Sequence, residues 1–284
     1  MKDKICLITG ATSGIGEITA RELAIQGAHV ILLARNPDKA EKVQKEIIAA
    51  CGHDKVDILL ADLASLQAVK TAGEAFMNRY THLDVLINNA GLIAGNAKEY
   101  SKDGHELSLA VNHLAPFLLT SLLLPSLEKS REARVINVAS EAYKMAKPDW
   151  DHMQLENNYS AIKAYGNSKL YNILFTRELA RRLEDQGNNI DTYVLHPGVV
   201  ASNFSQSAGG VMHFVFKLMR PFLISPAEGA KTSIFLATAE RGQLKQGGYY
   251  IKKKSAAFKS NLVTVAHAQK LWQKSEEILN IKFL

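Results

Sequence analysis

The feature that most constrains this fold is the regular alternation of short β-branched runs with longer stretches of helical periodicity. Strands that alternate with helices in this way form parallel sheets covered on both faces. We therefore expect an α/β fold with a doubly wound parallel sheet in a single domain, 1–284, interrupted by a small insertion at about 202–225. Strands are predicted at 4–9, 29–34, 56–61, 85–88, 134–138, 190–195 and 248–251, and helices at 15–26, from 37, between 61 and 85, and at 107–127, 160–184 and 226–239.

Composition and charge exclude several classes of protein. With 47% hydrophobic and 22% charged residues, the chain resembles ordinary globular proteins. Its net charge is +6, and basic runs such as Lys252 to Lys254 are short and lack interleaved aromatic residues, so no nucleic-acid partner is expected. The two cysteines have neither pairing nor metal-ligand spacing, which favours a reduced, cytoplasmic setting without a metal site.

The most apolar stretch, 107–127, is interrupted by Asn112, His113, Pro116 and Pro125. These residues suit a buried core helix better than a membrane span, so no transmembrane segment is predicted. The first residues also lack the anatomy of a signal peptide.

A glycine-rich turn, T-G-A-T-S-G-I-G, directly follows the first expected strand and opens the first expected helix. Gly10, Gly14 and Gly16 permit a tight turn, and they let backbone N–H groups approach a pyrophosphate at the helix N-terminus. The spacing is a variant of the G-x-G-x-x-G dinucleotide fingerprint, found in the strand-to-helix context that this motif requires. The turn predicts a dinucleotide cofactor.

The end of the second strand indicates which dinucleotide is bound. Arg35 stands where an NAD-preferring site places an acidic residue for the ribose 2′-hydroxyl, and a cation suits a 2′-phosphate instead. We predict NADP(H) over NAD(H), with an exposed strand-end arginine as the alternative. Asn36 is an expected helix N-cap, followed by Pro37. Asp62, at the end of the third strand, suits either the adenine amino group or the cap of the next helix.

Tyr165 and Lys169 are four residues apart in A-Y-G-N-S-K-L, so they share one helix face. A phenol ionises near pH 10, and a lysine charge at about 4 Å would lower that pKa toward neutrality. An exposed Tyr/Lys pair on an amphipathic helix would have the same spacing, so the pair alone does not establish a catalytic site.

These motifs together resemble the short-chain dehydrogenase/reductase family over about the first 200 residues. The resemblance lies in the glycine turn, N-N-A-G at 88–91, Ser140 after the fifth strand, Tyr-x-x-x-Lys and H-P-G at 196–198, in the family's order. V-N-H-L-A-P-F-L-L-T, A-Y-G-N-S-K-L and L-H-P-G-V-V further resemble its retinol-dehydrogenase-like branch. The resemblance implies a Rossmann fold.

The resemblance also implies a role for each matching residue. Tyr165 would exchange a proton with the substrate oxygen, Ser140 would donate a hydrogen bond to that oxygen, and Lys169 would lower the pKa of Tyr165 and bind the nicotinamide ribose. Asn112 is the implied fourth catalytic residue. The expected cofactor-binding residues are Gly10, Thr12, Ser13, Gly14, Ile15, Gly16, Arg35, Asn36, Asp62, Leu63, Asn89, Ala90, Gly91, Tyr165, Lys169, Pro197, Gly198, Val200 and Ser202.

Asn112 has a rationale of its own in the sequence. Pro116 lies four residues later and has no N–H, so the Asn112 carbonyl loses its helical partner. A freed carbonyl can hold a water, which fits the proton relay that the family implies. A kink without function is the competing interpretation.

The segment 209–224 is rich in Phe, Met, Val and Leu and falls where the family carries its substrate-binding insertion. It predicts a lid over a lipophilic carbonyl or alcohol; core packing, an oligomer interface and a peripheral membrane contact explain the same composition. The long helix at 160–184 is a candidate homodimer face. The sequence thus predicts an NADP(H)-dependent oxidoreductase, and the alternative is a noncatalytic NADP(H)-binding sensor or scaffold.

Overall fold

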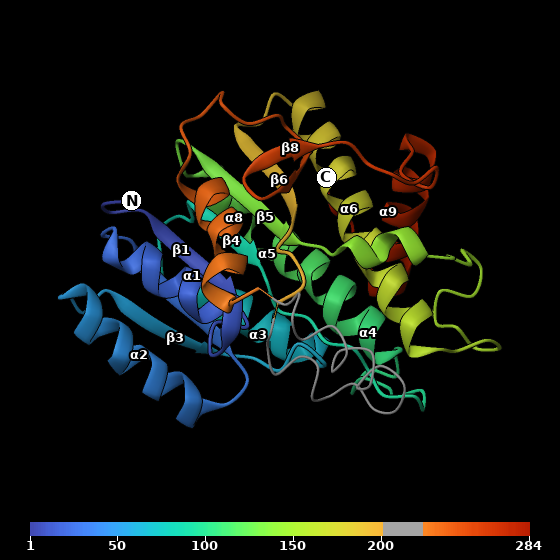
Figure 1. The fold of residues 1–284 in the computed structure, drawn as a ribbon, viewed down its shortest axis with the longest axis horizontal. Helices are drawn as coiled ribbons and strands as arrows, with labels where there is room; N and C mark the ends of the chain where they lie inside the picture. The colour runs from blue at the N-terminus through green and yellow to red at the C-terminus, as the bar shows by residue number, and fades with distance from the viewer. Residues whose placement is uncertain (201–223) are drawn as a thin grey trace.

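The computed structural model describes residues 1–200 and 224–284, and these form one eight-stranded sheet in the order β3-β2-β1-β4-β5-β6-β7-β8 (Figure 1). All neighbouring strands pair in parallel except β7 and β8. The predicted doubly wound parallel sheet is therefore confirmed. The strands are β1 (Ile5–Thr9), β2 (His29–Ala34), β3 (Val56–Leu60), β4 (Val85–Asn88), β5 (Ala133–Val138), β6 (Ile190–His196), β7 (Gly248–Ile251) and β8 (Lys254–Ala256).

Helices cover both faces of the sheet because successive side chains of each strand point to opposite sides. In β1, Leu7 joins one apolar core with α3, α5, α6 and α9, whereas Cys6 and Ile8 join a second core with α1, α2 and α8. The helices are α1 (Gly14–Ile25), α2 (Pro37–Cys51), α3 (Leu66–Arg79), α4 (Leu107–Leu109), the π-helical turn η1 (Ala110–Leu114), α5 (Ala115–Glu128), the 3-10 helix η2 (Glu141–Met145), α6 (Ala161–Asp185), α8 (Pro226–Thr238) and α9 (Val265–Leu279).

Local signals in the sequence set several helix starts. The Asn36 side chain accepts from Lys39 N at 2.9 Å and Pro37 opens α2, as predicted. Ser160 caps α6 in the same way, through Lys163 N at 3.2 Å. Neither β8 nor α9 is predicted from the sequence, although the Thr264 cap and the buried positions of α9 carry an ordinary helical signal.

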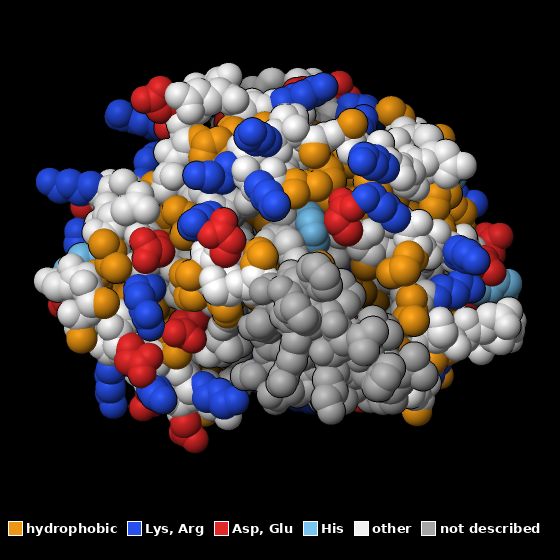
Figure 2. Space-filling view, in the orientation of Figure 1, with side chains coloured by type: hydrophobic (Ala, Val, Ile, Leu, Met, Phe, Trp, Pro, Cys, Tyr) orange, Lys and Arg blue, Asp and Glu red, His pale blue; other side chains and the backbone are white. Residues whose placement is uncertain are grey.

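The apolar helix formed by α4, η1 and α5 (Leu107–Glu128) is, among the described residues, the one helix long and apolar enough to cross a membrane. However, 78% of its most apolar window is buried inside the protein. The expectation of a core helix agrees with this burial. On the face in Figure 2, basic side chains are most numerous in the upper half, with hydrophobic and a few acidic side chains among them.

Some expectations fall outside the described residues. Residues 201–223, which contain Ser202 and nearly all of the expected lid, lie there, so the lid and the domain limits stay predictions. The expected homodimer face on α6 stays a prediction, although the chain's own helix α9 packs along part of α6.

Candidate active site

The predicted glycine turn lies at the carboxyl end of β1, where the strand order reverses between β1 and β4. Gly10 and Gly14 have left-handed φ values of +64° and +58°. A Cβ at Gly16 would lie 2.3 Å from Gly10 O and 2.4 Å from Asn89 Nδ2. Only glycine fits there.

Asn89 and Ala90 fasten the loop after β4 to the glycine turn. Asn89 Nδ2 donates to Thr9 O at 2.9 Å, and the backbone N–H groups of Asn89 and Ala90 donate to Thr9 Oγ1 at 3.0 and 2.9 Å. The two loops on either side of the switch point therefore form one rigid unit. Parallel α/β sheets bind their ligands at this position.

The N-terminus of α1 fits a dinucleotide pyrophosphate. The N-cap residue Ser13 is exposed and its side chain makes no capping hydrogen bond, so the first N–H groups of this helix can bind an anion. Thr12 is half-buried beside it. Ile15 and Val200 pack against α8, because a Cβ at Gly229 would meet their side chains at 3.2 and 2.7 Å.

On the expected adenosine side, Arg35 is exposed at the end of β2, and within the described ranges no ion pair or hydrogen bond holds its guanidinium. Asp62 Oδ1 accepts from Ala64 N at 3.0 Å and Oδ2 lies 3.5 Å from Lys102 Nζ. The alternative that Asp62 caps the next helix is wrong, because Ser65 is the N-cap of α3. Leu63, next to Asp62, is buried.

Ser140, Tyr165 and Lys169 come together beside the end of β5. Ser140 N-caps η2, and its hydroxyl hydrogen-bonds the Tyr165 phenol. Lys169 lies one turn further along α6, with Nζ 3.1 Å from Val138 O and 5.5 Å from the centroid of the Tyr165 ring. The spacing places both side chains on one face of the helix, as expected.

Burial dominates the electrostatics of this pair. It raises the pKa of Tyr165 to about 12, opposed by the hydrogen bond from Ser140, and it lowers the pKa of Lys169 to about 8. The expectation that Lys169 lowers the pKa of Tyr165 is therefore not met in this structure. Desolvation disfavours the charged form of both groups.

Asn112 lies in the π-helical turn η1 and is fully buried. Its Oδ1 accepts from Leu92 N at 2.8 Å, while Nδ2 donates to Leu92 O at 2.9 Å and to Ser168 Oγ at 3.0 Å. A Cβ on Gly91 would lie 3.2 Å from Lys169 Nζ and 3.3 Å from Asn112 Oδ1. Asn112, Gly91 and Lys169 are thus immediate neighbours. The expected kink before Pro116 takes the form of this wider helical turn.

The segment after β6 completes the site. Gly198 has a φ of +96°, and a Cβ there would lie 2.5 Å from the Ile224 side chain. Val200 forms an isolated parallel bridge with Ile224. Pro197 and Gly198 are half-buried at the same edge of the sheet as Ser140.

Polar residues inside the sheet support the site, and Asn88, the first residue of N-N-A-G, is one of them. Asn88 Nδ2 donates to Asn137 Oδ1 at 2.9 Å, and Asn137 Nδ2 donates to Thr176 Oγ1 at 2.9 Å, which links β4, β5 and α6. Asn172 Nδ2 donates to Val138 O at 3.2 Å, the carbonyl that Lys169 also uses. One signal for Asn137 was available in the sequence: it is an amide inside a strand whose other residues, apart from Arg134, are apolar.

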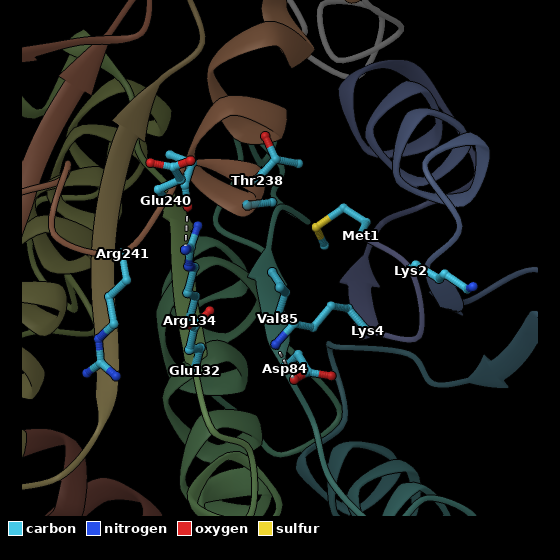
Figure 3. Close-up of a pocket in the computed structure, with 12 residues that line it drawn as sticks. Met1, Lys2, Lys4, Asp84, Val85, Glu132, Arg134, Thr238, Glu240 and Arg241 are labelled. Carbon is cyan, nitrogen blue, oxygen red and sulfur yellow. Dashed lines mark hydrogen bonds and ion pairs between the residues drawn. The ribbon is translucent and has the colours of Figure 1, made fainter.

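A cavity of about 420 Å³ lies at the opposite edge of the sheet (Figure 3). Arg134 and Lys4 line it, and both are held: Arg134 Nη1 donates to Leu236 O at 2.9 Å and Lys4 Nζ to Asp84 Oδ1 at 3.2 Å. These contacts join α8 to β5 and β1 to β4. The cavity is separate from the candidate site, which we assign from the geometry around Tyr165.

The sheet order and the glycine turn define a Rossmann-type α/β protein, in which Ser140, Tyr165 and Lys169 lie together beside the end of β5. The chain belongs to the short chain dehydrogenase family, which it matches over residues 4–210. It is thus an oxidoreductase of a family that acts on alcohol and carbonyl groups.

Individual proteins resemble it over nearly their whole length. Human retinol dehydrogenase 12 is 40% identical over 99% of this chain and 87% of its own. A structure of an uncharacterized protein from Mycobacterium paratuberculosis is 30% identical, with a TM-score of 0.80 over 100% of this chain and 96% of its own. The 3-ketoacyl-(acyl-carrier-protein) reductase of Brucella melitensis, complexed with NADH, is 25% identical, with a TM-score of 0.69 over 87% and 96%. The resemblance to the retinol-dehydrogenase-like branch is confirmed.

Proposed function

We propose that this protein is an NADP(H)-dependent oxidoreductase that reduces the carbonyl of a lipophilic small molecule or oxidises the corresponding alcohol. The observation that carries the proposal is the hydrogen bond between Ser140 and the Tyr165 phenol, with Lys169 on the same helix face. Two hydroxyl donors that meet at one point can both contact a substrate oxygen, where charge develops during the reaction.

The cofactor, when bound, supplies or accepts the hydride. Tyr165 gives a proton to the carbonyl oxygen, and Ser140 donates a hydrogen bond to the same oxygen. A pKa of about 12 keeps the phenol protonated at neutral pH, which is the form that a carbonyl reduction uses. The reverse oxidation uses the phenolate as the base that removes the alcohol proton.

Lys169 and Asn112 serve the proton supply in this proposal. Lys169 Nζ is buried between Tyr165 and the end of β5 and suits a ribose hydroxyl. The Asn112 side chain is fully used by Leu92 and Ser168, so the backbone carbonyl is the atom left to hold a relay water. The remaining expected residues, from the glycine turn to Val200, line the dinucleotide.

Arg35 supports NADP(H) over NAD(H). Its exposed guanidinium stands at the end of β2, where a 2′-phosphate would be bound, and has no competing partner among the described residues. The Brucella reductase was crystallised with NADH. Cofactor choice therefore has to be measured with both dinucleotides.

Exposed apolar side chains around the site support a lipophilic substrate. Met145, Ile162 and Val199 are 54%, 43% and 37% exposed. They end η2, begin α6 and follow β6, and all three segments lie at the carboxyl edge of the sheet. The relative's name, retinol dehydrogenase, points to the same class of substrate. A cytoplasmic setting suits the two free cysteines.

The deciding experiment is a cofactor-consumption assay with a panel of long-chain, aromatic and terpenoid aldehydes, run with NADPH and NADH in parallel. We expect turnover of the lipophilic carbonyls with NADPH and its loss in Tyr165→Phe, which keeps the ring but removes the proton. Turnover of small polar carbonyls alone would contradict the substrate class. NADPH binding without turnover of any carbonyl, unaffected by Tyr165→Phe, would instead support a noncatalytic sensor or scaffold.

A further inference from the structure

The C-terminal helix α9 lies outside the part of the chain that matches the family, yet it reaches the helix that carries Asn112. Its buried residue Ser275 contacts His113, which directly follows Asn112 in η1: His113 Nε2 lies 2.7 Å from Ser275 Oγ. Ser275 Oγ also donates to Leu271 O at 2.8 Å. A hydroxyl has one proton, so the histidine nitrogen is the donor in this pair.

His113 has no other polar partner in the part of the chain that the structure describes. The ring is completely buried among Phe117, Tyr171 and Phe175, with centroids 6.0, 5.4 and 6.4 Å away, and Nδ1 has no hydrogen bond. Burial lowers the pKa of His113 to about 3, so the ring is neutral. Ser275 therefore provides the single hydrogen bond that orients this side chain.

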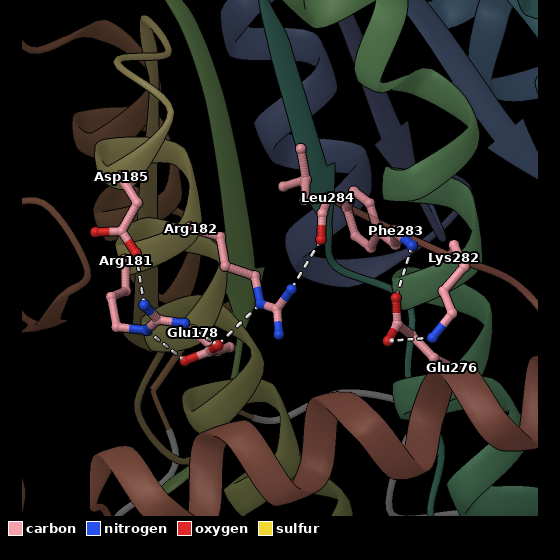
Figure 4. Close-up of polar contacts among 8 residues, drawn as sticks. All are labelled: Glu178, Arg181, Arg182, Asp185, Glu276, Lys282, Phe283 and Leu284. Atoms are coloured by element: carbon pink, nitrogen blue, oxygen red, sulfur yellow. Dashed lines mark hydrogen bonds and ion pairs between the residues drawn. The ribbon is translucent and has the colours of Figure 1, made fainter.

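The position of α9 is itself fixed against α6 (Figure 4). Trp272 is buried between Phe117 and Phe283, at centroid distances of 4.9 and 4.8 Å, and the Arg182 guanidinium lies 4.4 Å from its ring. Arg182 also donates to Leu284 O at 2.8 Å and to the buried Glu178 at 2.8 Å. These contacts make α9 a rigid support rather than a loose tail.

We propose that α9 is a positioning element of the active site, in which Ser275 holds His113 and thereby the π-helical turn that carries Asn112. The turn is clamped from two sides: Leu92 and Ser168 hold the Asn112 side chain, and Ser275 holds the next residue. Single π-helical turns inside α-helices are rare and frequently occur at functional sites. This inference rests on the proposed function, where the Asn112 carbonyl belongs to the proton relay.

The test compares Ser275→Ala, Ser275→Thr and the double variant Ser275→Ala/His113→Phe in the full-length protein. Ser275→Ala leaves the buried ring N–H of His113 without a hydrogen-bond partner and releases the π-helical turn η1. We expect kcat for carbonyl reduction to fall about tenfold, since small displacements of catalytic groups have effects of this size or larger. KM for NADPH stays unchanged, and the solvent deuterium isotope effect on kcat increases because proton transfer becomes slower. Ser275→Thr keeps the hydroxyl and retains kcat.

The double variant separates positioning from stability. Removing both partners leaves no unpaired donor, so the melting temperature returns toward that of the unmodified protein. If α9 positions Asn112, kcat nevertheless stays low; if kcat returns together with stability, the contact only supports packing and the inference is wrong. Thr238→Val is the matched control. The Thr238 hydroxyl donates to Ile234 O at 2.9 Å, four residues earlier in its helix, as the Ser275 hydroxyl does to Leu271 O. Thr238 lies at the opposite edge of the sheet from the active site.

Failure of the inference differs from failure of the proposed function. An inactive Tyr165→Phe with an unchanged Ser275→Ala refutes the role of α9 alone. A fully active Tyr165→Phe refutes the proposed chemistry itself.

Discussion

Lys169 Nζ lies 5.5 Å from the centroid of the Tyr165 ring, but it donates its hydrogen bond to Val138 O at 3.1 Å. The two groups are neighbours on α6, and burial moves the pKa of each toward its neutral form: to about 12 for Tyr165 and about 8 for Lys169. The first group to change charge above neutrality is therefore the lysine.

The pH dependence of carbonyl reduction follows from that order. We expect kcat/KM to fall above about pH 8, because this ratio reports the free enzyme and Lys169 loses its proton there while Tyr165 remains protonated. The measurement is the pH profile of kcat/KM for NADPH, determined from initial rates at NADPH concentrations below saturation. Lys169→Arg keeps its charge and should move the decrease to higher pH. A profile that is the same in both proteins would assign the decrease to another group.

Lys169 should also make folding stability depend on pH. Its folded pKa of about 8 lies below the ordinary value of 10.5, so between these values the unfolded chain holds a proton that the folded protein has released. Stability then rises with pH through that window, and the cost of the buried charge is largest below about pH 8. Urea unfolding of the unmodified protein and of Lys169→Met checks this. Their difference should narrow as the pH rises from 8 to 10; a constant difference would contradict the burial-lowered pKa.

The sheet and most helices could be predicted because their signals are local. Asn36 and Pro37 start a helix from adjacent positions, and β-branched runs read as buried strands wherever they occur. The contact between His113 and Ser275 could not be predicted, because 162 residues separate the partners. Spacing correctly placed Tyr165 and Lys169 on one face, but it gave the wrong direction for the tyrosine pKa, since burial is a property of the packed core.

Arg35 offers a direct test of cofactor choice. Arg35→Ala should raise KM for NADPH by about ten- to a hundredfold, the effect of one charge-assisted hydrogen bond to a phosphate, and leave KM for NADH unchanged. Initial rates with both dinucleotides measure this. Arg35→Lys keeps the charge but loses the forked donors, so its KM for NADPH should lie between those of the unmodified protein and of Arg35→Ala. Equal effects on NADPH and NADH would mean that Arg35 does not contact the 2′-phosphate.

Gly16 should tolerate no side chain. In Gly16→Ala the new Cβ would lie 2.3 Å from Gly10 O, so the turn has to move. We expect NADPH to lose most of its affinity, measured by fluorescence titration, while the far-UV circular dichroism spectrum is preserved. Gly73→Ala in α3 is the matched control: it meets only the Leu122 side chain, at 3.1 Å, and should bind NADPH normally. Retained affinity in Gly16→Ala would remove the glycine turn from the cofactor site.

Pro116 should keep the Asn112 carbonyl available to the proton relay. Pro116→Ala supplies the missing N–H, so the carbonyl four residues earlier gains a helical hydrogen bond and is less able to hold a water. We expect kcat for reduction to fall several-fold and its solvent deuterium isotope effect to rise, while KM for NADPH is unchanged. Pro125→Ala is the matched control, since Pro125 lies in the same apolar helix but is exposed and remote from Asn112. If Pro116→Ala, like Pro125→Ala, leaves the rate and the isotope effect unchanged, the carbonyl of Asn112 takes no part in proton transfer. Asn112 then acts only through its side chain, which holds Leu92 and Ser168.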